Sequence, residues 1–160
     1  MAYFNSTSER VRSYPDSGGY NVIRSLFSDI NYTTGNTYLH FKTNVPIASY
    51  IMTMIEMVGY NYGNAAAIRC SWGFYTYGTY IISSSISTAS SGNTYSGDYT
   101  GIVPHGIYAT GDGYVAIRGY APSNYYTGFI LNGYQTAGNG RGFDLKILAA
   151  SYGTNSGSAW

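Results

Sequence analysis

The feature that most constrains the fold of this chain is a two-residue alternation between apolar and polar side chains. It is clearest in the segment AAAIRCSWGFYTY, which covers residues 65–77. The apolar positions of that segment are Ile68, Cys70, Trp72 and Phe74. An extended strand places every second side chain on the same face, whereas a helix repeats every 3.6 residues. The segment therefore predicts a β-strand with one apolar face.

The same alternation returns along the chain from residue 36 onward, interrupted by Gly-rich turns. Other segments that show it are NTYLHFK, GDGYVAIRGY, YYTGFILNGYQT and FDLKILAASY. The segment SYIMTMIEMVGY fits a strand or a helix, and its β-branched residues together with Gly59 favour the strand. The alternation predicts that the following apolar side chains face inward: Leu39, Phe41, Ile51, Ile55, Met57, Val115, Ile117, Phe129, Leu131, Phe143, Leu145 and Ile147. About eight strands without intervening helices predict an all-β fold, an antiparallel β-sandwich that is jelly-roll-like.

Three stretches of different character divide the 160 residues, which suffice for one domain. Residues 1–35 are polar and poorly periodic apart from a short apolar piece at 22–27, so an irregular N-terminal arm is expected there. Residues 36–152 are expected to form the sandwich domain. Residues 153–160 read GTNSGSAW, and this composition predicts a flexible C-terminal tail.

Composition excludes several classes of protein. Tyr and Gly supply 20 and 21 residues, whereas charged residues make up only 9% of the chain. A net charge of +1 offers no basic excess to neutralise phosphates, so nucleic acid is not an expected partner. A hydrophobic content of 44% argues against a disordered chain.

No segment predicts export or insertion into a membrane. The first residues lack the apolar stretch of a signal peptide, and no run approaches the ~20 apolar residues of a membrane-spanning helix. We therefore expect synthesis in the cytoplasm and no membrane insertion. The glycosylation triplets at 5–7 and 31–33 are then interpreted as chance matches.

Residues that carry catalytic or metal chemistry are scattered along the sequence. His40 and His105 lie far apart and have no neighbours at metal-ligand spacing, so each is expected to be a surface or turn histidine. Cys70 alternates with core residues and is expected to be a small buried hydrophobe rather than a nucleophile. We therefore predict no catalytic residue, no metal site and no cofactor.

Glu56 is the carboxylate in the least usual setting. It interrupts an apolar segment and, on a strand, shares a face with Met52, Met54 and Val58. An unpaired carboxylate in apolar surroundings costs several kcal/mol, so Arg69 or Arg118 is expected to pair with it. Such a pair is more often structural than catalytic.

The remaining polar candidates predict turns. Asp98 and Asp112 each adjoin Gly, which favours turn formation. The loop at 110–113 is too short to bind calcium, and the loop at 138–142 lacks the Lys-Ser/Thr ending of a phosphate loop. A polysaccharide depolymerase needs two carboxylates at one bond, and Glu56 with these two Asp residues is its only support. We therefore expect no enzymatic activity.

Tyr is the dominant aromatic residue, and the sequence is compatible with three roles for its side chains. Tyr side chains fill wide sandwich interiors, line subunit interfaces, or stack on sugars and receptor surfaces. Tyr75, Tyr77 and Tyr80 gather at a strand–turn–strand junction and suit all three uses.

An ordered set of Gly- and Tyr-rich segments runs along the chain, namely VGYNYG, AIRCSWGFYTYG, DGYVAIRGY, YYTGFILNGYQT and FDLKILAAS, and it spans most of residues 39–151. This set resembles a family of small β-rich virion proteins of tailed bacteriophages. The resemblance implies a β-sandwich, commonly a homotrimer, that is displayed on the particle surface without enzymatic activity. It transfers no catalytic, metal, cofactor-binding or receptor-binding residue to this sequence.

The chain is too short to be a whole long fibre, because only about 35 residues without heptads precede its first clear strand. The expected function is a non-enzymatic structural protein of a bacteriophage virion, either a capsid decoration (cement) protein or a short fibre or tip subunit. Its expected partners are further copies of itself, as a homotrimer, and capsid or tail proteins, and its expected location is the virion surface. The alternative is a receptor- or glycan-binding adhesion domain of a tail fibre, with host cell-surface glycan as its partner.

Overall fold

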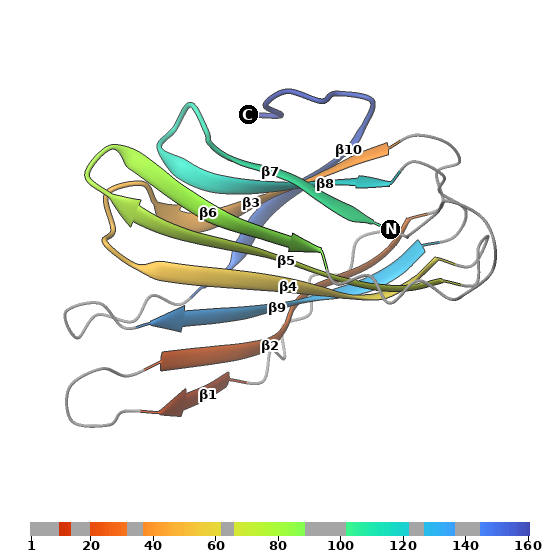
Figure 1. Cartoon of the computed structure of the whole chain (residues 1–160), viewed down its shortest axis with the longest axis horizontal. Coiled ribbons are helices and arrows are strands. Elements are labelled where there is room, and N and C mark those ends of the chain that lie inside the picture. Colours follow the sequence, from red (N-terminus) through yellow and green to blue (C-terminus); the bar gives the residue numbers. More distant parts are fainter. Residues whose placement is uncertain are drawn as a thin grey trace.

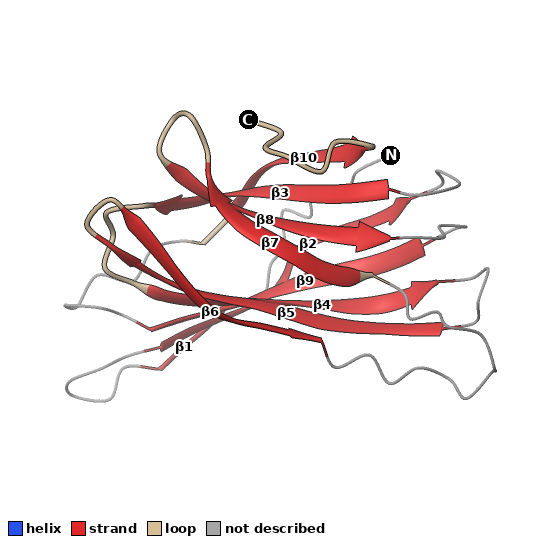
Figure 2. Cartoon of the chain, turned by 45° about the horizontal axis from the view of Figure 1, so that its top comes forward, coloured by secondary structure: helices blue, strands red, loops and turns tan. Residues whose placement is uncertain are grey.

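The structure, a computed structural model, describes residues 10–13, 20–31, 37–61, 66–88, 102–121, 127–136 and 145–160. These residues form ten β-strands and no helix, as the colouring of Figure 2 shows, which confirms the all-β class. The described part of the chain accordingly contains no helix long and apolar enough to cross a membrane.

The ten strands form two antiparallel sheets. In chain order they are β1 (Arg10–Ser13), β2 (Tyr20–Asn31), β3 (Thr37–Pro46), β4 (Met52–Asn61), β5 (Ala66–Tyr77), β6 (Tyr80–Thr88), β7 (Val103–Ala109), β8 (Tyr114–Ala121), β9 (Thr127–Thr136) and β10 (Ile147–Gly153). Sheet A has the order β1-β2-β9-β4-β5-β6, and sheet B has the order β10-β3-β8-β7. Figure 1 shows the two sheets as facing layers, which confirms the predicted antiparallel sandwich.

The chain passes between the sheets five times, at the β2–β3, β3–β4, β6–β7, β8–β9 and β9–β10 connections. These crossovers make neighbours of strands that are distant in sequence, such as β2 and β9 or β3 and β8. Each sheet is therefore assembled from separate parts of the chain, and neither can form from one continuous segment.

Two of the strands lie where an irregular arm was expected. β1 and β2 fall within residues 1–35, and β2 pairs with β9 from Tyr20 to Asn31. The expectation of an irregular segment is therefore corrected for both strands. Residues 1–9, 14–19 and 32–36 lie outside the described part of the chain.

A bulge explains why the sequence pattern of β2 does not look like that of a strand. Three residues of β2 lie opposite the single residue Asn132 of β9, and Leu26 and Phe27 both contact the core although they are adjacent. Ser25 has a positive φ of 53°, and its N–H donates to Asn132 Oδ1 over 3.0 Å. Bulges of this kind break the two-residue period on which strand prediction relies.

The hydrophobic core lies between the sheets and follows the predicted alternation. Phe143 lies outside the described residues. The other side chains predicted to face inward are all buried, namely Leu39, Phe41, Ile51, Ile55, Met57, Ile68, Cys70, Trp72, Phe74, Val115, Ile117, Phe129, Leu131, Leu145 and Ile147.

Trp72 joins the two sheets through a hydrogen bond inside the core. Its side chain is fully buried, and its Nε1–H donates to the backbone oxygen of Arg118 on β8 over 2.9 Å. A bulge in β7 lies beside this oxygen, because His105 is an extra residue between the pairs that Pro104 and Gly106 form with β8. A bulge disrupts the ladder locally, and a buried indole N–H needs a hydrogen-bond acceptor. The Arg118 oxygen beside the bulge is the acceptor for the indole N–H of Trp72.

A second hydrogen bond between the sheets involves Tyr152 of β10. Its hydroxyl donates to Asp29 Oδ2 of β2 over 2.7 Å, and Asp29 is buried. Burial, together with the neighbouring carboxylate, raises the pKa of Tyr152. This carboxylate therefore has a structural role at the contact between β2 and β10.

Replacing Trp72 tests how strongly the fold depends on this contact. Trp72→Phe is expected to lower the free energy of unfolding by about 1–3 kcal/mol, because it leaves the Arg118 oxygen unpaired. Trp72→Ala is expected to lower it by about 3–5 kcal/mol through loss of core packing. Urea unfolding followed by circular dichroism measures both changes. Trp160→Phe serves as the control, and an equal loss in the control and in Trp72→Phe would contradict this account.

Candidate functional surfaces

The residues proposed for chemistry do not meet at one place. His40 and His105 belong to sheet B, Glu56 belongs to sheet A, and Cys70 lies in the core. Asp98 and the loop at 138–142 lie outside the described residues. Within the described part of the chain, no three His, Cys, Asp or Glu side chains are grouped so that they could hold a metal ion.

Cys70 faces the core on β5, as the alternation predicts. Burial, with a smaller contribution from the charge of Glu56, raises the pKa of its thiol to about 12. At neutral pH the side chain is therefore a protonated thiol, which is a poor nucleophile and a weak metal ligand.

The burial of Cys70 is tested by alkylation with iodoacetamide at about pH 8. The folded protein is expected to remain unlabelled and the urea-unfolded protein to be labelled quickly, as measured by mass spectrometry. The sequence contains a single Cys, so the site of labelling is unambiguous. Equal labelling rates with and without urea would show that the thiol is accessible in the folded state.

Glu56 lies on the outer face of sheet A and is paired there. Arg69 Nε donates to its Oε1 over 3.2 Å, and the Tyr134 hydroxyl donates to its Oε2 over 3.2 Å. The prediction of an arginine partner is confirmed for Arg69, whereas Arg118 lies on sheet B. The Arg69 side chain is 68% exposed, so the pair stabilises the fold by only about 0–1 kcal/mol.

Asp112 lies in the turn between β7 and β8, as expected. Its carboxylate accepts a hydrogen bond from Thr110 Oγ1 over 2.7 Å and forms an ion pair with Lys42. The hydrogen bond from Lys42, followed by that from Thr110, lowers the pKa of Asp112. Gly113 completes the turn with a φ of 85°, a conformation that favours glycine. This aspartate therefore fixes a turn that is remote from Glu56.

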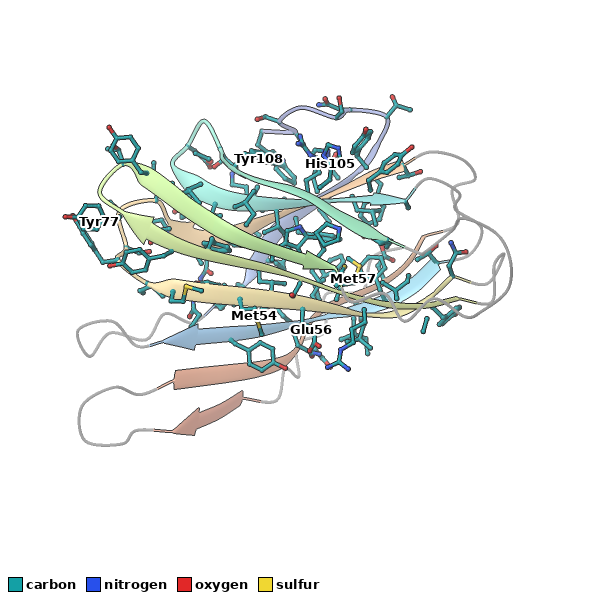
Figure 3. The ribbon with its side chains drawn as sticks, viewed as in Figure 1. Met54, Glu56, Met57, Tyr77, His105 and Tyr108 are labelled. Carbon is teal, nitrogen blue, oxygen red and sulfur yellow. The ribbon has the colours of Figure 1, made fainter. Side chains whose placement is uncertain are left out.

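The outer face of sheet A exposes apolar side chains on neighbouring strands. We call Met52, Met54, Val58 and Ile130 the apolar face, and each is 37–43% exposed. Figure 3 shows Met54 and Glu56 on this outer side of β4, while Met57 points between the sheets. Val58 and Ile130 are directly paired across β4 and β9. Strand β4 is therefore apolar on both faces, which is why its sequence also fitted a helix.

Tyrosine rings gather where β4 begins and β5 ends. Tyr50 and Tyr77 make an edge-to-face contact with ring centroids 5.3 Å apart, and Tyr75 stacks on Tyr77 at 6.4 Å. We call these three residues the tyrosine platform, and Figure 3 shows Tyr77 at one end of the molecule. Tyr80 pairs with Tyr77 in the β5–β6 hairpin and is 71% exposed. The predicted gathering of Tyr75, Tyr77 and Tyr80 is thus found, with Tyr50 added from another part of the chain.

The backbone that carries Tyr50 is held from both sides by Thr76. The Ser49 hydroxyl lies 2.6 Å from Thr76 Oγ1, and the Ile51 N–H donates to the same oxygen over 3.3 Å. Between them, Tyr50 has a positive φ of 57°, which is unusual for a bulky side chain. No local sequence signal marks this conformation, because Thr76 comes from a different strand.

The last residues of the chain lie across the outer face of sheet B rather than forming the expected flexible tail. Figure 1 shows this segment, residues 154–160, passing over the sheet. Arg118 Nη1 donates to the carbonyl oxygens of Ser156 and Gly157. The turn within the tail is closed by Asn155, whose Oδ1 accepts from the Gly157 N–H over 2.8 Å. Backbone carbonyls make most of these bonds, so the Gly and Ser composition gives no hint of them.

His40 lies beneath this tail and is fully hydrogen-bonded. Its Nε2 lies 2.9 Å from the backbone carbonyl oxygen of Asn155. Because a carbonyl oxygen only accepts hydrogen bonds, Nε2 carries the proton. Its Nδ1 then accepts from the Tyr108 hydroxyl at 2.9 Å, while the Ala159 N–H donates to that hydroxyl. Burial, with the charge of Arg118, lowers the pKa of His40. The sequence predicted a surface or turn histidine, but this side chain is buried on a strand.

His105 lies on the same sheet and is exposed. Arg118 Nε donates to its Nδ1 over 3.0 Å, and its ring contacts Tyr38 edge-to-face at 5.1 Å. Partial burial, followed by the charge of Arg118, lowers the pKa of His105 as well. Both histidines are therefore arranged as neutral rings around one guanidinium, and each makes hydrogen bonds within sheet B and its tail.

Stability is expected to decrease as the pH falls from about 7 to about 5. Both histidines have folded-state pKa values below the ordinary 6.5, so the unfolded chain binds more protons in this range. Urea midpoints across the range measure the effect. The double variant His40→Gln, His105→Gln should show a flatter profile, and identical profiles would contradict the assignment.

No family model, no curated protein and no solved structure matches this chain in sequence or structure comparisons.

Proposed function

We propose that this chain is a non-enzymatic structural protein of a bacteriophage virion, displayed on the particle surface as a capsid decoration protein or as a short fibre or tip subunit. The observation that carries the proposal is the apolar face on sheet A. These side chains lie on the side of the sheet that faces away from the core, and each keeps 37–43% of its surface exposed. Adjacent exposed apolar side chains on a rigid sheet are typical of an interaction surface.

The partner of the apolar face is a further copy of the same chain, in a homotrimer. The chain has a net charge of only +1, so identical copies repel one another weakly. Among the described side chains, the outer side of sheet A also carries Glu56 and Arg69, so neighbouring copies can place opposite charges together. Three such faces packed around a common axis form a closed assembly.

The placement of the ionisable residues supports a non-enzymatic role. Glu56 is paired on sheet A, Asp112 is paired in a turn of sheet B, and Asp29 joins the sheets. Glycoside cleavage needs two carboxylates that converge on one bond, and these three have separate structural partners. The assignment to a virion rests on the ordered set of segments that resembles small phage surface proteins.

The oligomeric state tests the proposal. Size-exclusion chromatography with light scattering should give a mass about three times the 17.4 kDa of one chain. The double variant Met54→Lys, Val58→Lys is expected to be a folded monomer, because it places charges in a desolvated contact. A wild-type protein that stays monomeric at micromolar concentration would overturn the proposed assembly.

Leu148→Lys supplies the matched control. This residue is 45% exposed on β10 of sheet B, so the same kind of substitution is made on the opposite side of the sandwich. The control should remain trimeric. If it dissociates as readily as the double variant, the added charge itself, and not the apolar face, is responsible.

Particle location is tested separately by electron microscopy of virions labelled with antibodies against the chain. Labelling over the head supports a decoration protein, and labelling at the tail supports a fibre or tip subunit. Unlabelled particles, confirmed by the absence of the chain from their protein content, would overturn the virion assignment.

A further inference from the structure

We propose that the tyrosine platform is a binding site for uncharged sugar residues of a polysaccharide. The platform consists of Tyr50, Tyr75 and Tyr77 and lies at one end of the sandwich (Figure 3). This inference goes beyond the structural role proposed above, because it assigns a ligand to the platform, whose Tyr75 adjoins the apolar face at Met52.

Two of the three residues of the platform are exposed, Tyr75 is half-buried, and the rings are already arranged for contact. Tyr50 is 46% exposed and Tyr77 is 55% exposed, although each contacts another ring. Their planes meet at 79°, whereas Tyr75 and Tyr77 are within 26° of parallel. The three rings therefore form an angled aromatic surface rather than one flat patch.

The backbone conformation of Tyr50 indicates that its position has a purpose beyond folding. A left-handed conformation costs a non-glycine residue roughly 1–2 kcal/mol, and glycine at this position would make the same turn without that cost. The hydrogen bond between the Ser49 and Thr76 hydroxyls, and the one that the Ile51 N–H donates to Thr76, hold the strained turn in place. Strain of this kind, kept by its surroundings, is found preferentially at binding and active sites.

The chemistry of the two segments that carry the platform favours an uncharged ligand that is both apolar and hydroxylated. The segments at 47–51 and 75–81 contain no Asp, Glu, Lys or Arg. Among the described residues, no hydrogen bond is recorded for the hydroxyls of Tyr50 and Tyr77, so they are available to a ligand. A sugar ring presents a face of C–H groups to an aromatic ring and hydroxyls at its edge, which matches a surface of tyrosines.

The size of the platform favours a sugar over a protein partner. A standard protein interface buries about 800 Å² on each side, which is far more than three partly exposed tyrosines offer. A few sugar residues, in contrast, are covered by two or three aromatic rings. Among the described residues, the two segments that carry the platform also provide none of the arginine or acid contacts that anchor many protein interfaces.

Saturation-transfer NMR with three neutral oligosaccharides, namely cellohexaose, chitohexaose and maltohexaose, tests the site. We expect transfer to the ring protons of at least one of them in the wild-type protein. Tyr77→Ala should weaken this binding on the order of tenfold or more, because it removes the ring that contacts both others. No transfer to any of the three sugars, or transfer that survives Tyr77→Ala, would overturn the proposal.

Two further variants separate binding from folding. Tyr50→Gly should lose sugar binding while raising the thermal midpoint, since glycine relieves the strained turn. Tyr60→Ala removes a tyrosine that is 52% exposed at the opposite end of β4, and sugar binding should be unchanged. A loss of sugar binding in Tyr60→Ala equal to that in Tyr50→Gly would argue against a localised site.

Light scattering on the same variants keeps this inference distinct from the proposed function. If Tyr77→Ala changes the molecular mass and leaves sugar binding unaffected, the platform is a contact between copies and the sugar site is overturned. If the wild-type protein binds sugar as a monomer, the sugar-binding site is supported and the proposed homotrimer is overturned.

Discussion

The contact between the two apolar sheet faces, centred on Trp72, is the interaction on which the rest of this structure depends. The indole N–H reaches across the core to the backbone oxygen of Arg118, where the β7 bulge interrupts the ladder. The same bulge carries His105 on the outside, and the Arg118 side chain holds both this ring and the tail. Arg118 of β8 therefore links the core, through its backbone oxygen, to the outer surface of sheet B, through its side chain.

The two outer faces of the sandwich differ in how they are covered. On sheet B, residues 154–160 bond to His40, Tyr108 and Arg118, so the chain supplies its own cover. On sheet A, Met54, Val58 and their neighbours remain exposed in the described structure. This asymmetry is the physical basis for proposing association through sheet A, because that face exposes several neighbouring apolar side chains in the described structure.

Sequence reasoning identified the strands and their inward faces, and it paired Glu56 with an arginine. It failed on β2, because a bulge places the adjacent Leu26 and Phe27 in the same core. It also failed on the tail, because composition reports the flexibility of an isolated segment and not the carbonyls that Arg118 and His40 bind. Both failures concern contacts between segments that are distant in the chain.

The sequence by itself determined which side chains face the core, because successive residues of a strand point to opposite sides through local geometry alone. Only the tertiary structure decided which strands became neighbours. The choice of neighbours in turn determined which side chains lie together on each surface. It brought Tyr50 against Tyr77 and His40 against Asn155, pairs that lie on different segments. Such pairings depend on burying the whole of both sheets together, so no single segment encodes them.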